Sequence, residues 1–155
     1  MGKLYSVPES EIETRIHRWL GEFELLDKRG HLIESFSHGM KQRLVMASVF
    51  LHEPQLLIVD EPMVGLDPRG ARRLKSLLKR ERDQRGLTVL LSTHTLGDAE
   101  ELCDHILLIH QGELLAQGSA DELRAEEGEG LEEVFIRLTE GESSETNLSS
   151  DLTRI

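Results

Sequence analysis

The sequence predicts an α/β fold in which helices flank a parallel sheet. Strand-like apolar runs alternate with helix-like segments along most of the 155 residues, a length that suits one domain. The runs at 55–60 and 87–92 show no polar alternation, which is typical of parallel strands covered on both faces. Polar residues follow these runs directly, and α/β sheets bind ligands at the carboxyl ends of their strands.

The first third of the chain predicts two helices. Residues 9–26 carry apolar side chains at helical spacing. These are Ile12, Ile16, Trp19, Leu20 and Phe23. A polar turn at 27–30 follows, and Ser37 is suited to cap a second helix over 38–52, which ends before Pro54. Its stretch 44–51 is almost entirely apolar, so we expect this helix to be buried.

A third helix begins after the first strand-like run. Asp67 is suited to cap it, Pro68 to occupy its first position and Gly86 to end it. One face is apolar, and the other is basic. The basic face comprises Arg69, Arg72, Arg73, Lys75, Lys79, Arg80, Arg82 and Arg85. Such a face is either an anion-binding patch or a solvated surface, and the pattern favours the second.

The remaining segments predict smaller elements. A short helix over 95–102 precedes strands at 104–110 and 113–117, and the turn Gln111-Gly112 between these strands indicates a hairpin. Residues 119–122 form a capping-box pattern, and 131–138 favours another helix. Residues 140–155 are rich in Ser, Thr and Glu, a composition typical of disorder.

Composition excludes several classes of protein. Hydrophobic residues make up 38% and charged residues 30%, a globular balance without an apolar run of the roughly 20 residues that span a bilayer. The first 30 residues are too charged for a secretory signal. A single cysteine excludes an internal disulfide, and the histidine spacing predicts no structural metal. Of the net charge of −11, −7 lies after residue 125 (nine acids and two bases), so the nearly balanced body argues against a broad nucleic-acid-binding surface.

The most informative residues are two adjacent acids at the end of the first strand. In Leu57-Ile58-Val59-Asp60-Glu61-Pro62, a buried strand delivers both carboxylates to an exposed end. Asp60 is suited to hold Mg²⁺, directly or through water, because hard cations prefer oxygen ligands. Glu61 is suited to orient and deprotonate a water molecule. Taken alone, the pair is equally consistent with solvated acids at a strand end.

Three further motifs surround this pair in a fixed order. Ser37-His38-Gly39-Met40-Lys41-Gln42-Arg43 precedes it, and Gly65-Leu66-Asp67 and Ser92-Thr93-His94 follow it. The order and spacing resemble the signature motif, Walker B strand, D-loop and switch histidine of the nucleotide-binding domain of ABC transporters. The resemblance runs from about residue 4 to residue 138.

This resemblance implies a partial P-loop NTPase (RecA-like) fold with part of the ABC helical subdomain. Residues 1–53 would belong to the helical subdomain and carry the signature motif. Residues 54–125 would form the C-terminal part of the ATPase core, and 126–155 an acidic extension.

The resemblance also implies a role for each site residue. Ser37 and Gly39 would contact the γ-phosphate of ATP held by a partner domain, as a helix N-terminus can. Asp60 would lie near Mg²⁺, and Glu61 would act as the general base. Asp67 would link the two sites of a dimer. By the same resemblance, His94 would donate a hydrogen bond to the γ-phosphate.

Two features depart from the family pattern. His38 and Met40 replace a glycine and a glutamine of the usual signature, which resembles the bacterial branch that serves ABC-2-type exporters. The segments 118–123 and 131–135 resemble that branch too. The second departure is larger, because no G-x-x-x-x-G-K-[ST] phosphate-binding loop occurs, and Gly2-Lys3 is followed by Leu4. We therefore expect a fragment of a longer ATPase that is inactive alone.

The implied activity is ATP hydrolysis that drives export across a membrane. The implied partners are a second ABC ATPase domain and a transmembrane permease, which would hold the chain at the cytoplasmic face of the membrane. An alternative is a non-catalytic module that donates its signature motif to a partner ATPase. A role in DNA repair or translation is disfavoured, because the sequence has no long coiled-coil insertion, tandem domain or basic surface.

Overall fold

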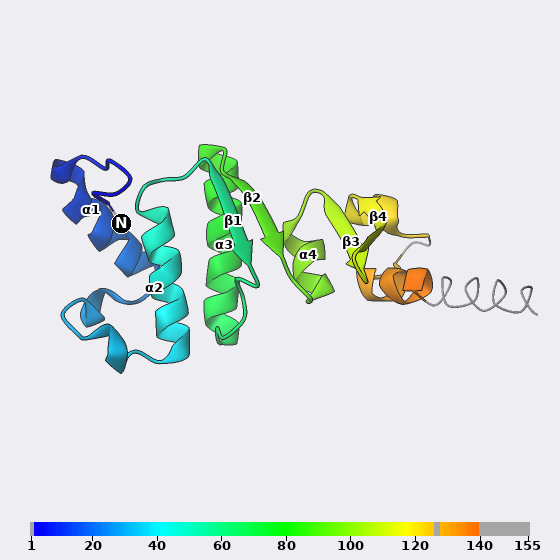
Figure 1. Ribbon diagram of the computed structural model, residues 1–155, viewed down its shortest axis with the longest axis horizontal. Coiled ribbons are helices and arrows are strands. Elements are labelled where there is room, and N and C mark those ends of the chain that lie inside the picture. The colour runs from blue at the N-terminus through cyan, green and yellow to red at the C-terminus, as the bar shows by residue number, and fades with distance from the viewer. Residues whose placement is uncertain (1, 126–127, 140–155) are drawn as a thin grey trace, which may run out of the picture. The chain divides into compact units, whose positions relative to one another are not determined.

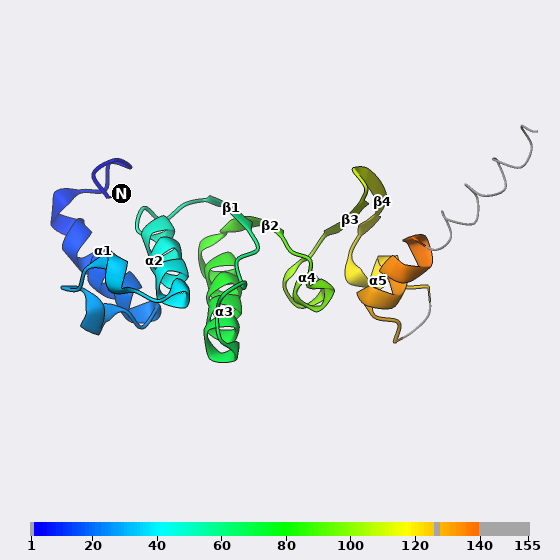
Figure 2. The same ribbon diagram turned by 60° about the horizontal axis from the view of Figure 1, so that its bottom comes forward.

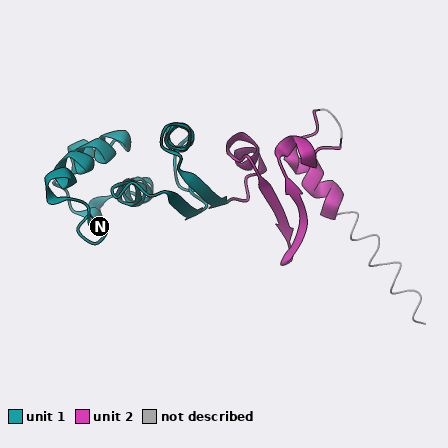
Figure 3. Cartoon of the chain, turned by 90° about the horizontal axis from the view of Figure 1, so that it is seen from above, with its two compact units in different colours: residues 1–92 teal, residues 93–155 magenta. Residues whose placement is uncertain are grey.

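The computed structural model describes residues 2–125 and 128–139, and the chain divides into two compact units (Figure 3). The first comprises residues 1–92 and the second residues 93–155. This division groups residues by packing, and the boundaries expected from the family at 53 and 125 stay a prediction.

Helix α1 spans Glu9–Glu22 and is four residues shorter than predicted. Glu24 adopts a left-handed conformation with φ 54°, and its N–H donates to the Gly21 carbonyl at 3.1 Å. The Leu25 N–H donates to the Leu20 carbonyl at 2.8 Å. These two bonds form a Schellman end, in which a non-glycine residue takes the position that glycine usually fills. The turn directs Leu25 into the core, where it is 1% exposed.

Helix α2 spans His38–Phe50 and has Ser37 as its N-cap, as predicted. It ends two residues before the expected His52. Two short 3₁₀ turns, η1 (Leu26–Lys28) and η2 (Ile33–Ser35), join α1 to α2.

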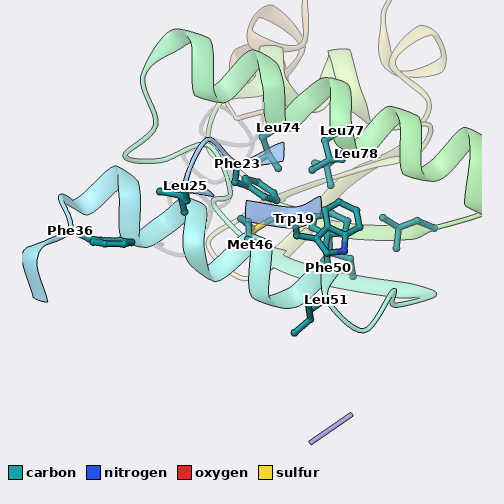
Figure 4. Close-up of a cluster of buried hydrophobic side chains, with 13 residues drawn as sticks. Trp19, Phe23, Leu25, Phe36, Met46, Phe50, Leu51, Leu74, Leu77 and Leu78 are labelled. Carbon is teal, nitrogen blue, oxygen red and sulfur yellow. The ribbon is translucent and has the colours of Figure 1, made fainter. Parts of the chain in front are cut away.

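Helix α3 spans Pro68–Arg85, with Asp67 as its N-cap and Gly86 in a left-handed C-cap at φ 69°. These boundaries confirm the prediction. Helices α1, α2 and α3 lie side by side in both ribbon views (Figures 1 and 2). Their apolar faces form one core in which Trp19 of α1 stacks on Phe50 of α2 with ring centroids 4.9 Å apart (Figure 4). Leu74, Leu77 and Leu78 close this core from α3.

Strands β1 (Leu56–Asp60) and β2 (Thr88–Ser92) pair in parallel, which confirms the predicted topology. The expectation that both faces would be covered is wrong for this unit. Leu57 is 3% exposed, whereas Leu56, Ile58 and Leu90 are 54%, 67% and 54% exposed. Helix α3 connects the strands and packs on the Leu57 face, so the apolar run is buried on one side only.

The basic face of α3 is partly used in ion pairs. Arg80 lies 3.2 Å from Glu22 of α1, and Arg73 lies 2.8 Å from Glu24. Arg85 lies 2.7 Å from Glu53 in the turn before β1. These guanidinium groups tie α3 to its neighbours, so this part of the face is neither a simple anion patch nor fully solvated.

The second unit contains α4 (Leu96–Leu102), β3 (Ile106–His110), β4 (Glu113–Gly118) and α5 (Ala120–Leu123), with residues 131–139 helical. Strands β3 and β4 form the predicted antiparallel hairpin. Its turn residues Gln111 and Gly112 have φ of 49° and 86°, as in a type I′ turn. The capping box of α5 is present, and the prediction for residues 140–155 lies outside the described residues. Within the described ranges, each helix is too short or too polar to cross a membrane.

Candidate functional site

Asp60 is the last residue of β1 and pairs in register with Ser92, the last residue of β2. The Ser92 hydroxyl donates a hydrogen bond to Asp60 Oδ1. The carboxylate is therefore held by the neighbouring strand at the carboxyl edge of the sheet, where ligands bind in α/β folds. Sequence reasoning did not single out Ser92 as a site residue. The signal was available, because parallel strands of equal length bring their last residues together.

Glu61 follows Asp60 in a left-handed conformation, with φ 47°. Its N–H donates to the Ser92 carbonyl at 3.0 Å, and its carbonyl accepts from Val64 N at 3.1 Å. The chain thus leaves the sheet abruptly at Glu61. A left-handed non-glycine residue costs on the order of 1 kcal/mol and persists where surrounding bonds enforce it, as they do here. Such residues concentrate at functional sites.

Asp67 lies after the loop that begins at Glu61. Its Oδ1 accepts a hydrogen bond from Gly70 N at 2.7 Å, which caps α3. This bond, with a second backbone bond from Arg69 and the charges of Arg43 and Arg69, lowers the pKa of the Asp67 carboxyl below its ordinary value. The side chain therefore stays ionised at neutral pH, while its exposed surface leaves it open to a partner.

Ser37 stands at the N-terminus of α2, and its hydroxyl accepts from Met40 N at 3.3 Å. The first turn of a helix presents N–H groups and the positive end of the helix dipole, both of which favour an anion. Ser37 is exposed and Gly39 is half-buried. This end of α2 thus has the chemistry of a phosphate-binding position.

The N-terminal end of α2 lies against the loop before α3 (Figure 1). A Cβ atom added to Gly39 would lie 2.9 Å from the Gly65 carbonyl oxygen, so the two backbones are in close contact. Ser37, Gly39, Asp60, Glu61 and Asp67 all belong to the first unit and are connected through this contact and through the 61–67 loop. His94 is exposed in the second unit, between β2 and α4, and its part in the site stays a prediction.

The donor set at the strand ends fits a hard cation in part. Asp60, Glu61 and Ser92 offer carboxylate and hydroxyl oxygens, which Mg²⁺ prefers. Among the described residues, no group of three or more His, Cys, Asp or Glu side chains is arranged to hold a metal ion. The arrangement therefore suits an ion whose remaining ligands are water and phosphate oxygens, as is common for Mg²⁺. A separate cleft of about 610 Å³ is lined by residues of α1 and α3 and by none of these oxygens.

Comparison with known proteins identifies relatives over most of the chain. The family model of the ABC transporter matches residues 2–64, a span that contains Ser37, Gly39, Asp60 and Glu61. The uncharacterised ABC transporter ATP-binding protein YthP of Bacillus subtilis is 34% identical over 90% of this chain and 60% of its own length. The daunorubicin resistance ATP-binding protein DrrA3 of Streptomyces coeruleorubidus is 36% identical over 88% of this chain and 43% of its own.

A solved ATP-binding subunit of an ABC transporter has the same fold. It superposes with a TM-score of 0.77 at 38% identity, over 89% of this chain and 58% of that structure. The chain thus spans less than two thirds of each of these relatives. The matches to YthP and to this structure nevertheless cover about nine tenths of the chain, and the chain belongs to the family of ABC transporter ATP-binding proteins.

Proposed function

We propose that this chain supplies part of the ATP-hydrolysing site of an export-type ABC transporter. The observation that carries the proposal is the end of β1, where Asp60 is held by Ser92 and Glu61 leaves the sheet in a bond-enforced left-handed turn. A relative named for daunorubicin resistance supports outward transport, because removal of a toxic compound confers resistance.

Each residue has a definite task in this proposal. Ser92 orients the Asp60 carboxylate toward the side that faces a bound cation. Glu61 accepts a proton from a water molecule, a role that a positioned carboxylate can perform. Ser37 and the first-turn N–H groups of α2 bind phosphate oxygens of a nucleotide held by a second ATPase domain. Bound MgATP would supply the phosphoryl group and the neutralising charge.

We further propose that the chain acts with two partners: a second ABC ATPase domain, whose nucleotide faces Ser37 and Gly39, and a permease that places it at the cytoplasmic face of a membrane. The permease would select the substrate. Support comes from the exposed Ser37 at the N-terminal end of α2. This end of the helix contacts the 61–67 loop through Gly39 and Gly65.

We expect the isolated chain to bind ATP weakly and not to hydrolyse it. The 155 residues contain no G-x-x-x-x-G-K-[ST] loop, and the N–H groups and lysine of such a loop make most phosphate contacts. Titration of the purified chain with MgATP by isothermal calorimetry should give no heat at micromolar concentrations. A dissociation constant in the micromolar range would overturn this part of the proposal.

A second candidate function is a half-site module that donates Ser37 and Gly39 but does not use Glu61. The two candidates differ in a mixture with complete YthP, whose ATPase rate is measured as chain is added. The catalytic proposal predicts stimulation that Glu61→Gln removes, and the half-site proposal predicts stimulation that Glu61→Gln leaves intact. Ser37→Asp keeps a good N-cap but repels phosphate, so it should abolish stimulation in both cases. Absence of stimulation by the unaltered chain counts against both.

A further inference from the structure

The contact between His38 and Gly65 links the two segments of the candidate site. A Cβ atom added to Gly65 would lie 2.5 Å from His38 Cδ2 and 2.8 Å from His38 Nε2. The imidazole therefore occupies the place where a side chain at position 65 would begin. Gly65 also has φ 80°, a conformation that residues with a Cβ rarely adopt. Two independent constraints thus require glycine at this position.

The reciprocal contact has a different chemical basis. Gly39 would place a Cβ atom 2.9 Å from the Gly65 carbonyl oxygen, which belongs to the backbone and cannot rotate away. Gly65 therefore lies against both the His38 ring and the backbone of the first turn of α2. Close approach of this kind is possible only where one backbone lacks a side chain.

The loop that Gly65 belongs to connects the acid pair to the D-loop aspartate. Within it, Val64 N bonds the Glu61 carbonyl at 3.1 Å and Leu66 N bonds the Met63 carbonyl at 3.2 Å. Asp67 then caps α3 through Gly70 N. A displacement of Gly65 would therefore be transmitted toward Glu61 in one direction and toward Asp67 in the other.

We propose that His38 is a positioning residue that sets the conformation of the 61–67 loop by packing on Gly65. It thereby holds the phosphate-binding N-terminal end of α2 and the water-activating end of β1 in one arrangement. The role of this loop in catalysis rests on the proposed function. The packing itself rests on the geometry. In the family pattern given above, a glycine usually stands at this position, and its lack of a ring would leave Gly65 without this contact.

Hydrogen exchange of single amides in the full chain tests the positioning. In His38→Ala, the Leu66 and Gly70 amides should exchange about tenfold faster than in the unaltered chain, because loss of the ring favours local opening of the loop. The midpoint of thermal unfolding should change little, since His38 is exposed and outside the core. The matched control is His31→Ala, which removes an exposed histidine that lies in the connection between α1 and α2. This variant should leave the exchange of both amides unchanged. Unchanged exchange in His38→Ala would overturn the proposal.

A pair of glycine substitutions tests whether the ring is the obstacle. Gly65→Ala should lower the unfolding midpoint by about 5 °C when His38 is present and by clearly less in combination with His38→Gly, because only the strain of positive φ then remains. Gly39→Ala should cost the same in both backgrounds, since its obstacle is a backbone oxygen. Equal effects of Gly65→Ala in the two backgrounds would contradict the proposed contact.

The assay with complete YthP separates this proposal from the proposed function. If the unaltered chain stimulates hydrolysis, His38→Ala should reduce kcat severalfold while the KM for ATP changes less, because the phosphate-binding groups themselves remain. If the unaltered chain gives no stimulation, the proposed function fails, and the exchange experiment still decides whether His38 positions the loop.

Discussion

Asp67 joins the candidate site to the start of α3. The same carboxylate that the family resemblance assigns to dimer contacts accepts the Gly70 N–H at 2.7 Å and has a lowered pKa because of that bond. A cap of this kind fixes the direction in which the loop enters the helix. The functional and structural roles of Asp67 therefore depend on the same ionised group.

Replacement of Asp67 separates these roles. Asp67→Ala removes the cap and should lower the thermal unfolding midpoint by about 3 °C, whereas Asp67→Asn, which also caps helices, should preserve most of it. Because the folded pKa is lowered, the ionised carboxylate contributes stability above its ordinary pKa near 3.9, and this is lost as the pH falls through the lower folded value. Thermal unfolding at pH 7 and pH 3 should show a smaller acid loss for Asp67→Asn. Identical acid losses in the two proteins would contradict this assignment.

At the scale of elements, ion pairs connect the helices that carry the site. Glu81 of α3 has a side chain only 5% exposed and lies 3.5 Å from Arg18 of α1 and 3.4 Å from Arg85. Glu53, in the turn before β1, has a pKa lowered first by its hydrogen bond from Arg85 and further by the charges of Arg85, Arg15 and Arg18. The network thus joins α1, the β1 entry and α3 around shared guanidinium groups.

Removal of Glu81, the buried carboxylate of this network, should lower the stability of the fold. Glu81→Ala removes the buried carboxylate shared by Arg18 and Arg85, which still lie near Glu53, and should reduce the free energy of unfolding by about 2 kcal/mol, discounted for the partial exposure of both arginines. Glu24→Ala, which breaks the exposed pairs to Arg43 and Arg73, should cost only about 0.5 kcal/mol. Urea unfolding of both variants measures the difference. Equal costs would show that burial adds nothing to this network.

At the scale of the whole molecule, each unit contains a sheet with an apolar face exposed. In the first unit the exposed side chains are Leu56, Ile58 and Leu90. In the second unit they are Leu107, Ile109 and Leu114. Parallel sheets in α/β proteins are normally covered on both faces, and exposed apolar strands promote association. We therefore expect the isolated chain to oligomerise or to be poorly soluble.

Threonine substitutions on the exposed face test this expectation. Ile58→Thr combined with Leu90→Thr places a β-branched residue at both positions and should shift the chain toward monomer in light scattering, with little loss of stability. Leu57→Thr, on the buried face, should cost about 3 kcal/mol and is the control for strand integrity. A sharp, reversible two-state melt of the unaltered chain as a monomer would contradict the expectation.

Several elements were predictable because their causes are local. Ser37, Asp67 and Ser119 cap the helices that follow them, Gly86 ends α3, and Gln111-Gly112 turns the hairpin. Each signal acts within about four residues, so the sequence contains the whole cause. The end of α1 was predicted wrongly because a left-handed Glu24 replaces the usual glycine, and burial of Leu25 stabilises that turn.

The sequence by itself determined the family, the order of the helices and strands, and the candidate residues at the carboxyl end of β1, since motif spacing and hydrophobic periodicity are properties of the chain. Only the tertiary structure decided that Ser92 holds Asp60, that His38 packs on Gly65, and that one face of the β1–β2 sheet is exposed. These contacts join residues far apart in sequence. Their geometry depends on how the helices and strands pack, which no local pattern specifies.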